Sequence, residues 1–115
     1  MIFSRLFTTA DRDKPAREIS GDDLKRAIED KACVVVDVRE PSEFSRGHIP
    51  GAVNLPLSRF SPLELPQGKP VVFVCLSGAR SFAALNQALK AGAPDARHYP
   101  KGMNGWRAAG GDGVR

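Results

Sequence analysis

The sequence contains few cysteines, and their placement excludes two kinds of small protein. Its 115 residues include two cysteines, Cys33 and Cys75, which lie far apart and show no C-x-x-C or Cys/His spacing. Two cysteines cannot build a disulfide framework, and this spacing offers no zinc site. We therefore expect no metal and no other cofactor. Free thiols are typical of a reducing cytoplasm, which is the location that the sequence predicts.

Runs of apolar residues and runs of a single charge are also missing. No segment approaches the ~20 apolar residues of a membrane-spanning helix. Residues 1–16 lack the apolar core and cleavage site of a signal peptide, and we expect them to form a loosely held leader. The net charge of +4 comes from scattered basic residues, and 7% of the residues are aromatic. Neither a membrane nor a nucleic acid is therefore expected as a partner, whereas a small anion suits this charge.

Continuous apolar runs predict the strands of a parallel sheet. Apolar residues make up 42% of the chain and charged residues 26%, an ordinary balance for one globular core. The runs at 32–38 and 71–75 are too apolar for strands with one wet face, so we expect them to be buried on both faces. Shorter strands are predicted at 17–20, 52–56 and 96–102.

Helices are predicted in the segments between these strands. Ser20 is a capping residue before a helix over 21–30, which has acidic residues in its first turn. A strong helix over 80–92 ends at a glycine. Its apolar stripe consists of Phe82, Leu85 and Leu89. Shorter helices are expected at 41–47 and 103–110.

The alternation of strands and helices predicts one α/β domain. Prolines leave 57–70 mostly as loop, and no repeat or linker divides the chain. Such alternation favours an open parallel sheet with helices on both faces. The domain is expected to span residues 17–110, followed by a tail at 111–115.

The stretch VCLSGARSF, residues 74–82, joins the second buried strand to the strong helix. Cys75 stands at the carboxyl end of that strand, where open parallel sheets bind their ligands. Gly78 permits a tight reversal, and the N–H groups of such a loop can point inward as an anion nest. These groups and the positive end of the helix depress the pKa of a cysteine. Arg80 adds a fixed cation suited to a doubly charged oxyanion.

Two interpretations of Cys75 remain open on these residues alone. A free cysteine at the end of an apolar strand is commonly a small core residue. A cysteine that only packs has no need of Gly78 and Arg80 close behind it, nor of Ser81 at the opening of the helix. Local chemistry leaves the choice between a packed cysteine and a nucleophile close to even.

Three motifs resemble those of rhodanese-like domains. The stretch DVREPSEFSRGHIPGAVNLP at 37–56 resembles the family signature, CLSGARS at 75–81 its active-site loop, and YPKGMNGWRAAG at 99–110 its C-terminal motif. Together they cover nearly the whole chain in the family's order. The resemblance implies a rhodanese-like α/β fold with a five-stranded parallel sheet.

The same resemblance implies a sulfurtransferase that works through a Cys75 persulfide. The donor would be thiosulfate or a related persulfide or thiosulfonate, and a thiol, cyanide or a protein would accept the sulfur. Arg80 would orient the donor, and Ser81 is equally well placed as a hydroxyl donor or as a helix cap. The predicted persulfide-binding loop consists of Leu76, Ser77, Gly78, Ala79, Arg80 and Ser81.

The length of the loop separates two chemistries. Four residues lie between Cys75 and Arg80, as in sulfurtransferase members of the family, whereas the related dual-specificity phosphatases have one more. One residue fewer removes up to about 3.5 Å of chain reach. This favours sulfur transfer over phosphate ester hydrolysis or arsenate reduction. A non-catalytic persulfide relay or binding module acting with a protein partner remains the alternative.

The chain departs from the family pattern at two positions. Many family loops carry a basic residue directly after the cysteine, where this chain has Leu76. The site therefore has less charge for thiosulfate and a more apolar rim, which suggests a larger thiol or a protein persulfide as donor or acceptor. Asn104 stands where the C-terminal motif usually has a glycine, and asparagine tolerates the left-handed geometry of such a turn.

Three polar residues are expected to support the site. We expect Asp37 to accept hydrogen bonds from neighbouring loops, Arg39 to pair with Glu43, and His48 to make a structural hydrogen bond. Buried polar groups need such partners.

The remaining marked residues are expected to be structural. His98 falls in an edge-strand pattern and is expected at the surface, whereas Trp106 is expected to pack the last helix onto the core. If the two apolar strands are neighbours with Asp37 level with Cys75, about 13 Å separates Cys33 from Cys75. That distance excludes a disulfide, so Cys33 is expected to be a buried bystander.

Overall fold

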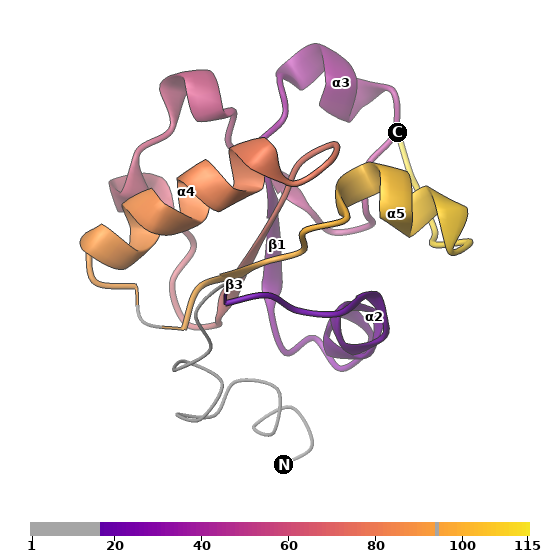
Figure 1. Cartoon of the computed structure of the whole chain (residues 1–115), viewed down its shortest axis with the longest axis horizontal. Helices are drawn as coiled ribbons and strands as arrows, with labels where there is room; N and C mark the ends of the chain where they lie inside the picture. Colours follow the sequence, from indigo (N-terminus) through magenta and orange to yellow (C-terminus); the bar gives the residue numbers. More distant parts are fainter. Residues whose placement is uncertain (1–16, 94) are drawn as a thin grey trace.

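A parallel sheet forms the centre of the fold (Figure 1). The computed structural model describes residues 17–93 and 95–115, so the predicted leader at 1–16 lies outside the described residues. Within that part of the chain, four strands pair in the order β2-β1-β3-β4, all parallel. They are β1 (Val34–Asp37), β2 (Val53–Asn54), β3 (Val71–Val74) and β4 (Arg97–His98).

The predicted fifth strand is reduced to one bridge. Glu18 forms an isolated parallel bridge with His98, at the outer side of β4. Arg17 has a positive φ of 47°, and Ser20 already caps the following helix, so only a short extended segment lies between them. The sheet therefore has four strands in the described residues, and the expectation of five is corrected.

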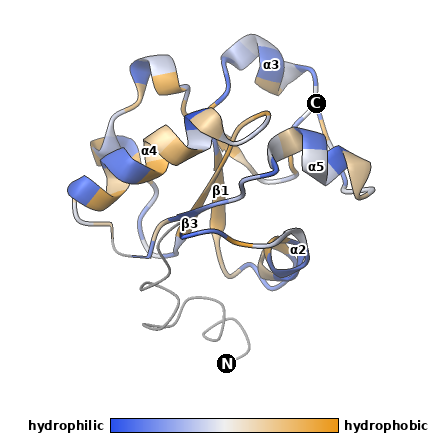
Figure 2. Cartoon of the chain, in the orientation of Figure 1, coloured by the Kyte–Doolittle hydropathy of each residue, from blue (hydrophilic) through white to orange (hydrophobic). Residues whose placement is uncertain are grey.

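Alternate residues of the two central strands face opposite layers of helices. Val36 and Phe73 pack with buried residues of the helix α4 (Ala79–Lys90) on one face. Val35 and Val72 pack with residues of α2 (Gly21–Glu29) and α5 (Gly102–Ala108) on the other. Figure 2 shows both central strands as hydrophobic and these helices as mixed in character. The unbroken apolar runs in the sequence follow from this double coverage.

Local signals set the helix ends. Ser20 Oγ accepts a hydrogen bond from the Asp23 N–H at 3.1 Å, as its position predicts. The α3 helix (Pro41–Ser45) begins with a reciprocal capping box between Glu40 and Glu43. Two single turns of 3₁₀ helix, η2 (Leu57–Arg59) and η3 (Pro62–Glu64), interrupt the proline-rich loop. No helix in the described residues is long and apolar enough to cross a membrane.

The predictions that two aromatic side chains on the helices are buried have different outcomes. Trp106 of α5 is buried in the core, as expected. Phe82 does not share the burial of Leu85 in α4, because 49% of its surface remains exposed. Its ring lies at the edge of α4 with its centroid 5.7 Å from that of His98.

The residues after α5 fold back towards α3. His48 and Val114 exchange backbone hydrogen bonds of 2.8 and 2.9 Å in an antiparallel bridge. Trp106 Nε1 donates to the carbonyl of Asp112 at 2.7 Å. In Figure 1 the C-terminus accordingly lies beside α3 and α5.

Candidate active site

The loop that carries Cys75 lies at the carboxyl end of β3, directly before α4. Gly78 takes the N-cap position with φ 108°, and a Cβ there would collide with the carbonyl oxygen of Pro100. Glycine is therefore required both by the backbone conformation and by the approach of another segment. Ser81 lies inside the helix, so it is not the cap.

The start of α5 fixes the other side of the loop. Met103 N–H donates to the Cys75 carbonyl at 2.8 Å, and Asn104 N–H donates to the Leu76 carbonyl at 3.1 Å. Gly102 brings these donors close with φ 61°, and a Cβ on it would collide with the same two carbonyls. The third sequence motif thus holds the active-site loop in place.

The sulfur of Cys75 is surrounded by hydrogen-bond donors. The side chain is 1% exposed, and the Gly78 N–H points at Sγ from 3.0 Å. Burial by itself raises the pKa of the thiol. Hydrogen bonds from the Ser81 hydroxyl and from the backbone of Ser81, Gly78 and Ser77 outweigh burial, so the pKa is lowered from its usual value.

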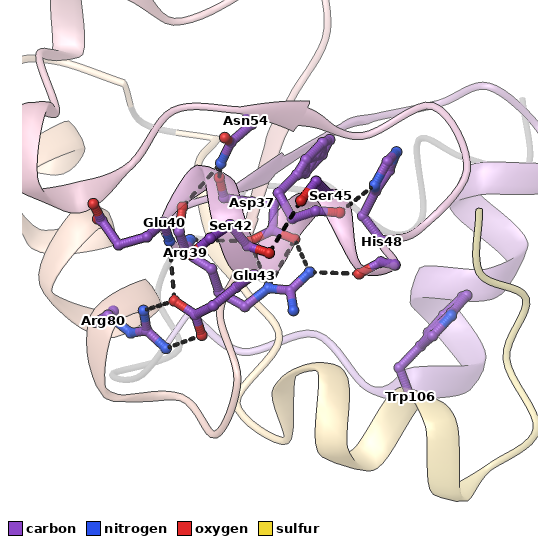
Figure 3. A network of polar contacts seen from close by, with 12 residues as sticks. Asp37, Arg39, Glu40, Ser42, Glu43, Ser45, His48, Asn54, Arg80 and Trp106 are labelled. Atoms are coloured by element: carbon purple, nitrogen blue, oxygen red, sulfur yellow. Dashed lines mark hydrogen bonds and ion pairs between the residues drawn. The ribbon is translucent and has the colours of Figure 1, made fainter. Parts of the chain in front are cut away.

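Arg80 is held by a carboxylate from α3 (Figure 3). Its two terminal nitrogens donate to Glu43 Oε1 at 2.7 Å and Oε2 at 3.1 Å, a two-pronged ion pair. These hydrogen bonds lower the pKa of Glu43 to about 2 and raise that of Arg80. The expected pairing of Glu43 with Arg39 is therefore wrong.

Arg39 pairs with Asp37 instead. Its Nε lies 3.0 Å from Oδ1 and its Nη2 lies 2.8 Å from Oδ2, and both side chains are buried. Nη2 also donates to the Gly47 carbonyl at 2.8 Å, and the Asn54 amide donates to the carbonyls of Asp37 and Arg39. A hydrogen-bonded turn thus connects the end of β1 to α3, which carries Glu43.

His48 makes local contacts on this same side. Its Nδ1 lies 2.8 Å from the Phe44 carbonyl, and the two rings stack with centroids 3.6 Å apart. Its backbone pairs with Val114. The residue shapes the loop after α3 through these contacts.

His98 is buried, which corrects the expectation of a surface position. It is 3% exposed, and its Nδ1 lies 3.0 Å from Ser81 Oγ. Level positions of neighbouring parallel strands point to the same face, and His98 is level with Phe73 beneath α4. No local pattern at 96–102 signalled this burial, because the face on which His98 lies depends on the register of β4 with β3.

A hollow of about 540 Å³ opens beside the loop. Leu76 forms part of its wall, with Glu43, Met103 and Trp106, and the exposed Arg46 and Arg107 stand at its margin. Neither arginine forms an ion pair among the described residues. The lining of the hollow therefore combines apolar residues with arginines, and it also includes the carboxylates of Glu43 and Asp112.

The two cysteines remain free. Asp37 is level with Val74 and not with Cys75, so five residues of rise, roughly 17 Å, separate Cys33 from Cys75 along the sheet. Cys33 is half-buried, and burial raises the pKa of its thiol to about 11. Among the residues that the structure describes, no three His, Cys, Asp or Glu side chains cluster to hold a metal ion.

Comparison with known proteins assigns the fold. The sequence model of the family described as the rhodanese-like domain matches residues 20–109. The chain belongs to the rhodanese-like family. Its structure superposes with a TM-score of 0.78 on the rhodanese-related protein of Thermoplasma volcanium, at 33% identity, over 85% of this chain and 97% of that one.

Curated relatives of this rhodanese-like chain include both a named enzyme and an uncharacterized protein. It is 36% identical over 110 residues to the thiosulfate:glutathione sulfurtransferase of Saccharomyces cerevisiae, a match that covers 81% of this chain and 79% of the yeast protein. It is 44% identical over 89 residues to an uncharacterized protein of Synechocystis, over 76% of this chain. This second match spans 50% of the Synechocystis protein.

Proposed function

We propose that this protein is a sulfurtransferase that carries sulfane sulfur as a persulfide on Cys75. The donor is thiosulfate or a related persulfide or thiosulfonate, and the acceptor is a thiol or cyanide. The supporting observation is the position of Cys75 Sγ, which faces the Gly78 N–H and the Ser81 hydroxyl at the carboxyl end of β3. Donors in this arrangement stabilise a sulfur anion, whether thiolate or persulfide.

The first step transfers a sulfane sulfur from the donor to Cys75. The Cys75 thiolate attacks the outer sulfur of thiosulfate, a sulfur–sulfur bond forms, and sulfite leaves with the electron pair of the bond that breaks. The total charge of the reactants, one thiolate and one thiosulfate dianion, equals that of the persulfide anion and the sulfite dianion. Arg80 at the rim offsets part of this charge.

The second step transfers the sulfur from the Cys75 persulfide to the acceptor. An acceptor thiolate attacks the terminal sulfur of the persulfide, takes that sulfur, and leaves the Cys75 thiolate with the electrons of the broken bond. With cyanide the product is thiocyanate. The Gly78 N–H contacts the inner sulfur in the resting protein and stabilises the thiolate that this step regenerates.

The hollow beside Leu76 suits an acceptor larger than cyanide. A volume of about 540 Å³ lies within the range of small-molecule sites. Leu76 in its wall and the guanidinium groups of Arg46 and Arg107, which form no ion pair among the described residues, fit a thiol that carries carboxylates. The S. cerevisiae relative is named for glutathione, which is such a thiol.

A persulfide relay to a protein partner is the second candidate. The observation that favours it is the pairing of Arg80 with Glu43, which reduces the positive charge that thiosulfate would meet. In that case Cys75 would hold the sulfur and release it slowly to small acceptors.

Mass spectrometry after incubation with thiosulfate tests the proposal. We expect an adduct of about 32 Da, one sulfur atom, on the wild type. Cys75→Ser should abolish the adduct, whereas Cys33→Ser should retain it because the Cys33 thiol has a pKa of about 11 and is half-buried. Turnover with glutathione or cyanide supports the enzyme, and a retained adduct without turnover supports the relay. A wild-type protein that forms no adduct with thiosulfate, with a thiosulfonate or with a persulfide donor contradicts both.

Leu76→Arg tests the choice of donor. A cation next to the thiol restores charge at the rim and should lower the KM for thiosulfate by about tenfold, the effect of one charge-assisted hydrogen bond. Leu76→Gln, similar in length but uncharged, is the control. An unchanged KM in the arginine variant would show that Leu76 does not set the preference for donors.

A further inference from the structure

Three buried side chains from three elements form a chain of contacts behind the candidate nucleophile. Cys75 Sγ lies 3.5 Å from Ser81 Oγ, and Ser81 Oγ lies 3.0 Å from His98 Nδ1. Their exposed fractions are 1%, 0% and 3%. The imidazole at the end of β4 thus reaches the sulfur at the end of β3 through one hydroxyl of α4.

The Ser81 hydroxyl has one proton and several neighbours. It can donate to the Gly78 carbonyl at 3.1 Å, to His98 Nδ1, or to Cys75 Sγ when that is a thiolate. Its oxygen has two lone pairs that can accept hydrogen bonds. The tautomer of His98 decides which of these arrangements is available.

The surroundings of the imidazole select its tautomer. His98 Nε2 is buried and has no hydrogen-bond partner within the described part of the chain. A buried N–H without an acceptor is rarer in proteins than a buried acceptor without a donor. A proton on Nε2 would leave such an N–H, whereas a proton on Nδ1 has the Ser81 oxygen to donate to. A doubly protonated ring would bury both an unpaired N–H and a charge.

The charges near the ring agree with a neutral imidazole. Burial lowers the pKa of His98 below its usual 6.5, and the opposing effect of Glu18, on the segment bridged to β4, is smaller. Arg80 is the charged residue of α4 next to the thiol, and its charge interacts with that of Cys75. The ring is therefore neutral at neutral pH.

We infer that His98 is a positioning residue that keeps the Ser81 hydroxyl free to donate to the Cys75 sulfur. In the thiol form, Ser81 Oγ accepts from the Cys75 S–H and from the His98 Nδ1–H, and its own proton goes to the Gly78 carbonyl. When the thiol ionises, the hydroxyl turns its proton to the sulfur. The Nδ1–H blocks the competing arrangement, in which the serine would donate to the imidazole.

This inference concerns the thiolate of Cys75, so it deepens the proposed function but is read out without sulfur transfer. The measurement is the rate of alkylation of Cys75 by iodoacetamide as a function of pH, in a Cys33→Ser background. Ser81→Ala and His98→Leu should each raise the apparent pKa of the thiol by about one unit, which leaves about tenfold less thiolate below that pKa. The double variant should shift it no further than Ser81→Ala alone.

His98→Asn is the conservative rescue. Its amide nitrogen can take the place of Nδ1–H, so its thiol pKa should stay close to that of the wild type. His98→Gln, whose amide reaches the place of Nε2, should behave like His98→Leu. An unchanged pKa in His98→Leu, or no difference between the asparagine and glutamine variants, would overturn the inference.

The tautomer can also be read in the unaltered protein, which removes any dependence on how variants fold. The ¹⁵N shifts of the His98 ring at neutral pH distinguish a protonated Nδ1 from a protonated Nε2. A proton on Nδ1 supports the inference, and a proton on Nε2 contradicts it. If the pKa shifts follow expectation but no persulfide forms with thiosulfate, the proposed function fails while the role of His98 stands.

Discussion

The environment of Arg80 differs from the one that its motif suggests. A cation within five residues of a nucleophile would ordinarily face the anionic substrate, yet here both terminal nitrogens bind Glu43. About a third of the Arg80 side chain remains exposed, at 34%, so solvent screens the pair. Glu43 therefore fixes the direction of the guanidinium and at the same time reduces the net charge that a donor meets.

Replacing Glu43 separates these two effects. Glu43→Gln keeps one hydrogen bond to Arg80 but releases its charge, so the KM for thiosulfate should fall by about threefold, the scale of an exposed ion pair. Arg80→Gln should raise the same KM. Steady-state kinetics at low salt measures both, with Asp23→Asn, from an exposed pair on α2, as control. A higher KM in Glu43→Gln would show that orientation outweighs charge.

The Glu43 carboxylate makes the stability of the fold depend on pH. The pKa of Glu43 is lowered in the folded protein from 4.5 to about 2, so its ionised form stabilises the fold fully above about pH 4.5. This contribution is lost as the pH falls towards 2. Urea unfolding should show a smaller loss of stability between pH 5 and pH 2 for Glu43→Gln than for the wild type. Equal losses would mean that the pair has no net effect on stability.

At the scale of elements, the contact between α5 and the active-site loop determines the shape of the site. The first turn of α5 donates N–H groups to the Cys75 and Leu76 carbonyls, and Gly102 makes this approach possible. The loop is thus fixed from both ends, by the start of α4 on one side and by the start of α5 on the other.

Gly102 in α5 and Gly110 just after the helix test this contact. Gly102→Ala should lower the free energy of unfolding by about 3 kcal/mol or more, because the added Cβ collides with backbone and takes a strained conformation. Gly110→Ala is the control, since its φ of 80° is equally unfavourable but nothing lies within 4 Å of the added atom. It should cost about 1 kcal/mol. Equal costs, measured by urea denaturation, would contradict the role of the α5 contact.

At the scale of the whole molecule, the buried pair of Asp37 and Arg39 ties the central sheet to the segments around the site. Arg39 bonds both to Asp37 at the end of β1 and to the Gly47 carbonyl after α3. Both charges are out of water, so each depends on the other for compensation. α3 in turn carries the carboxylate that holds Arg80, and Figure 3 shows the pairs side by side.

Breaking the buried pair should therefore destabilise the entire domain. Arg39→Ala should cost about 3–5 kcal/mol, since it leaves a buried carboxylate without its cation. Arg26→Ala removes an exposed partner of Asp23 and should cost at most about 1 kcal/mol. Chemical denaturation of the two variants gives the comparison. If Arg39→Ala lowers the free energy of unfolding no more than Arg26→Ala does, the buried pair does not stabilise the fold.

The sequence by itself determined the two central strands, the start of α2 and the place of Cys75. The runs at 32–38 and 71–75, the Ser20 cap and the glycine before α4 are local patterns, and each reports burial or backbone geometry at its own position. The spacing of four residues between Cys75 and Arg80 is likewise a local feature of the sequence. Such patterns carry no record of which distant segment lies opposite.

Only the tertiary structure decided the partners of the polar side chains. Glu43 binds Arg80 across 37 positions of sequence, and Ser81 meets His98 across 17. The expected pairing of Glu43 with Arg39, four residues away, was wrong because the buried Asp37 lies closer to that guanidinium. The surface position expected for His98 was wrong because the register with β3 turns it beneath α4. These contacts depend on strand order and register, which a single strand's own residues do not specify.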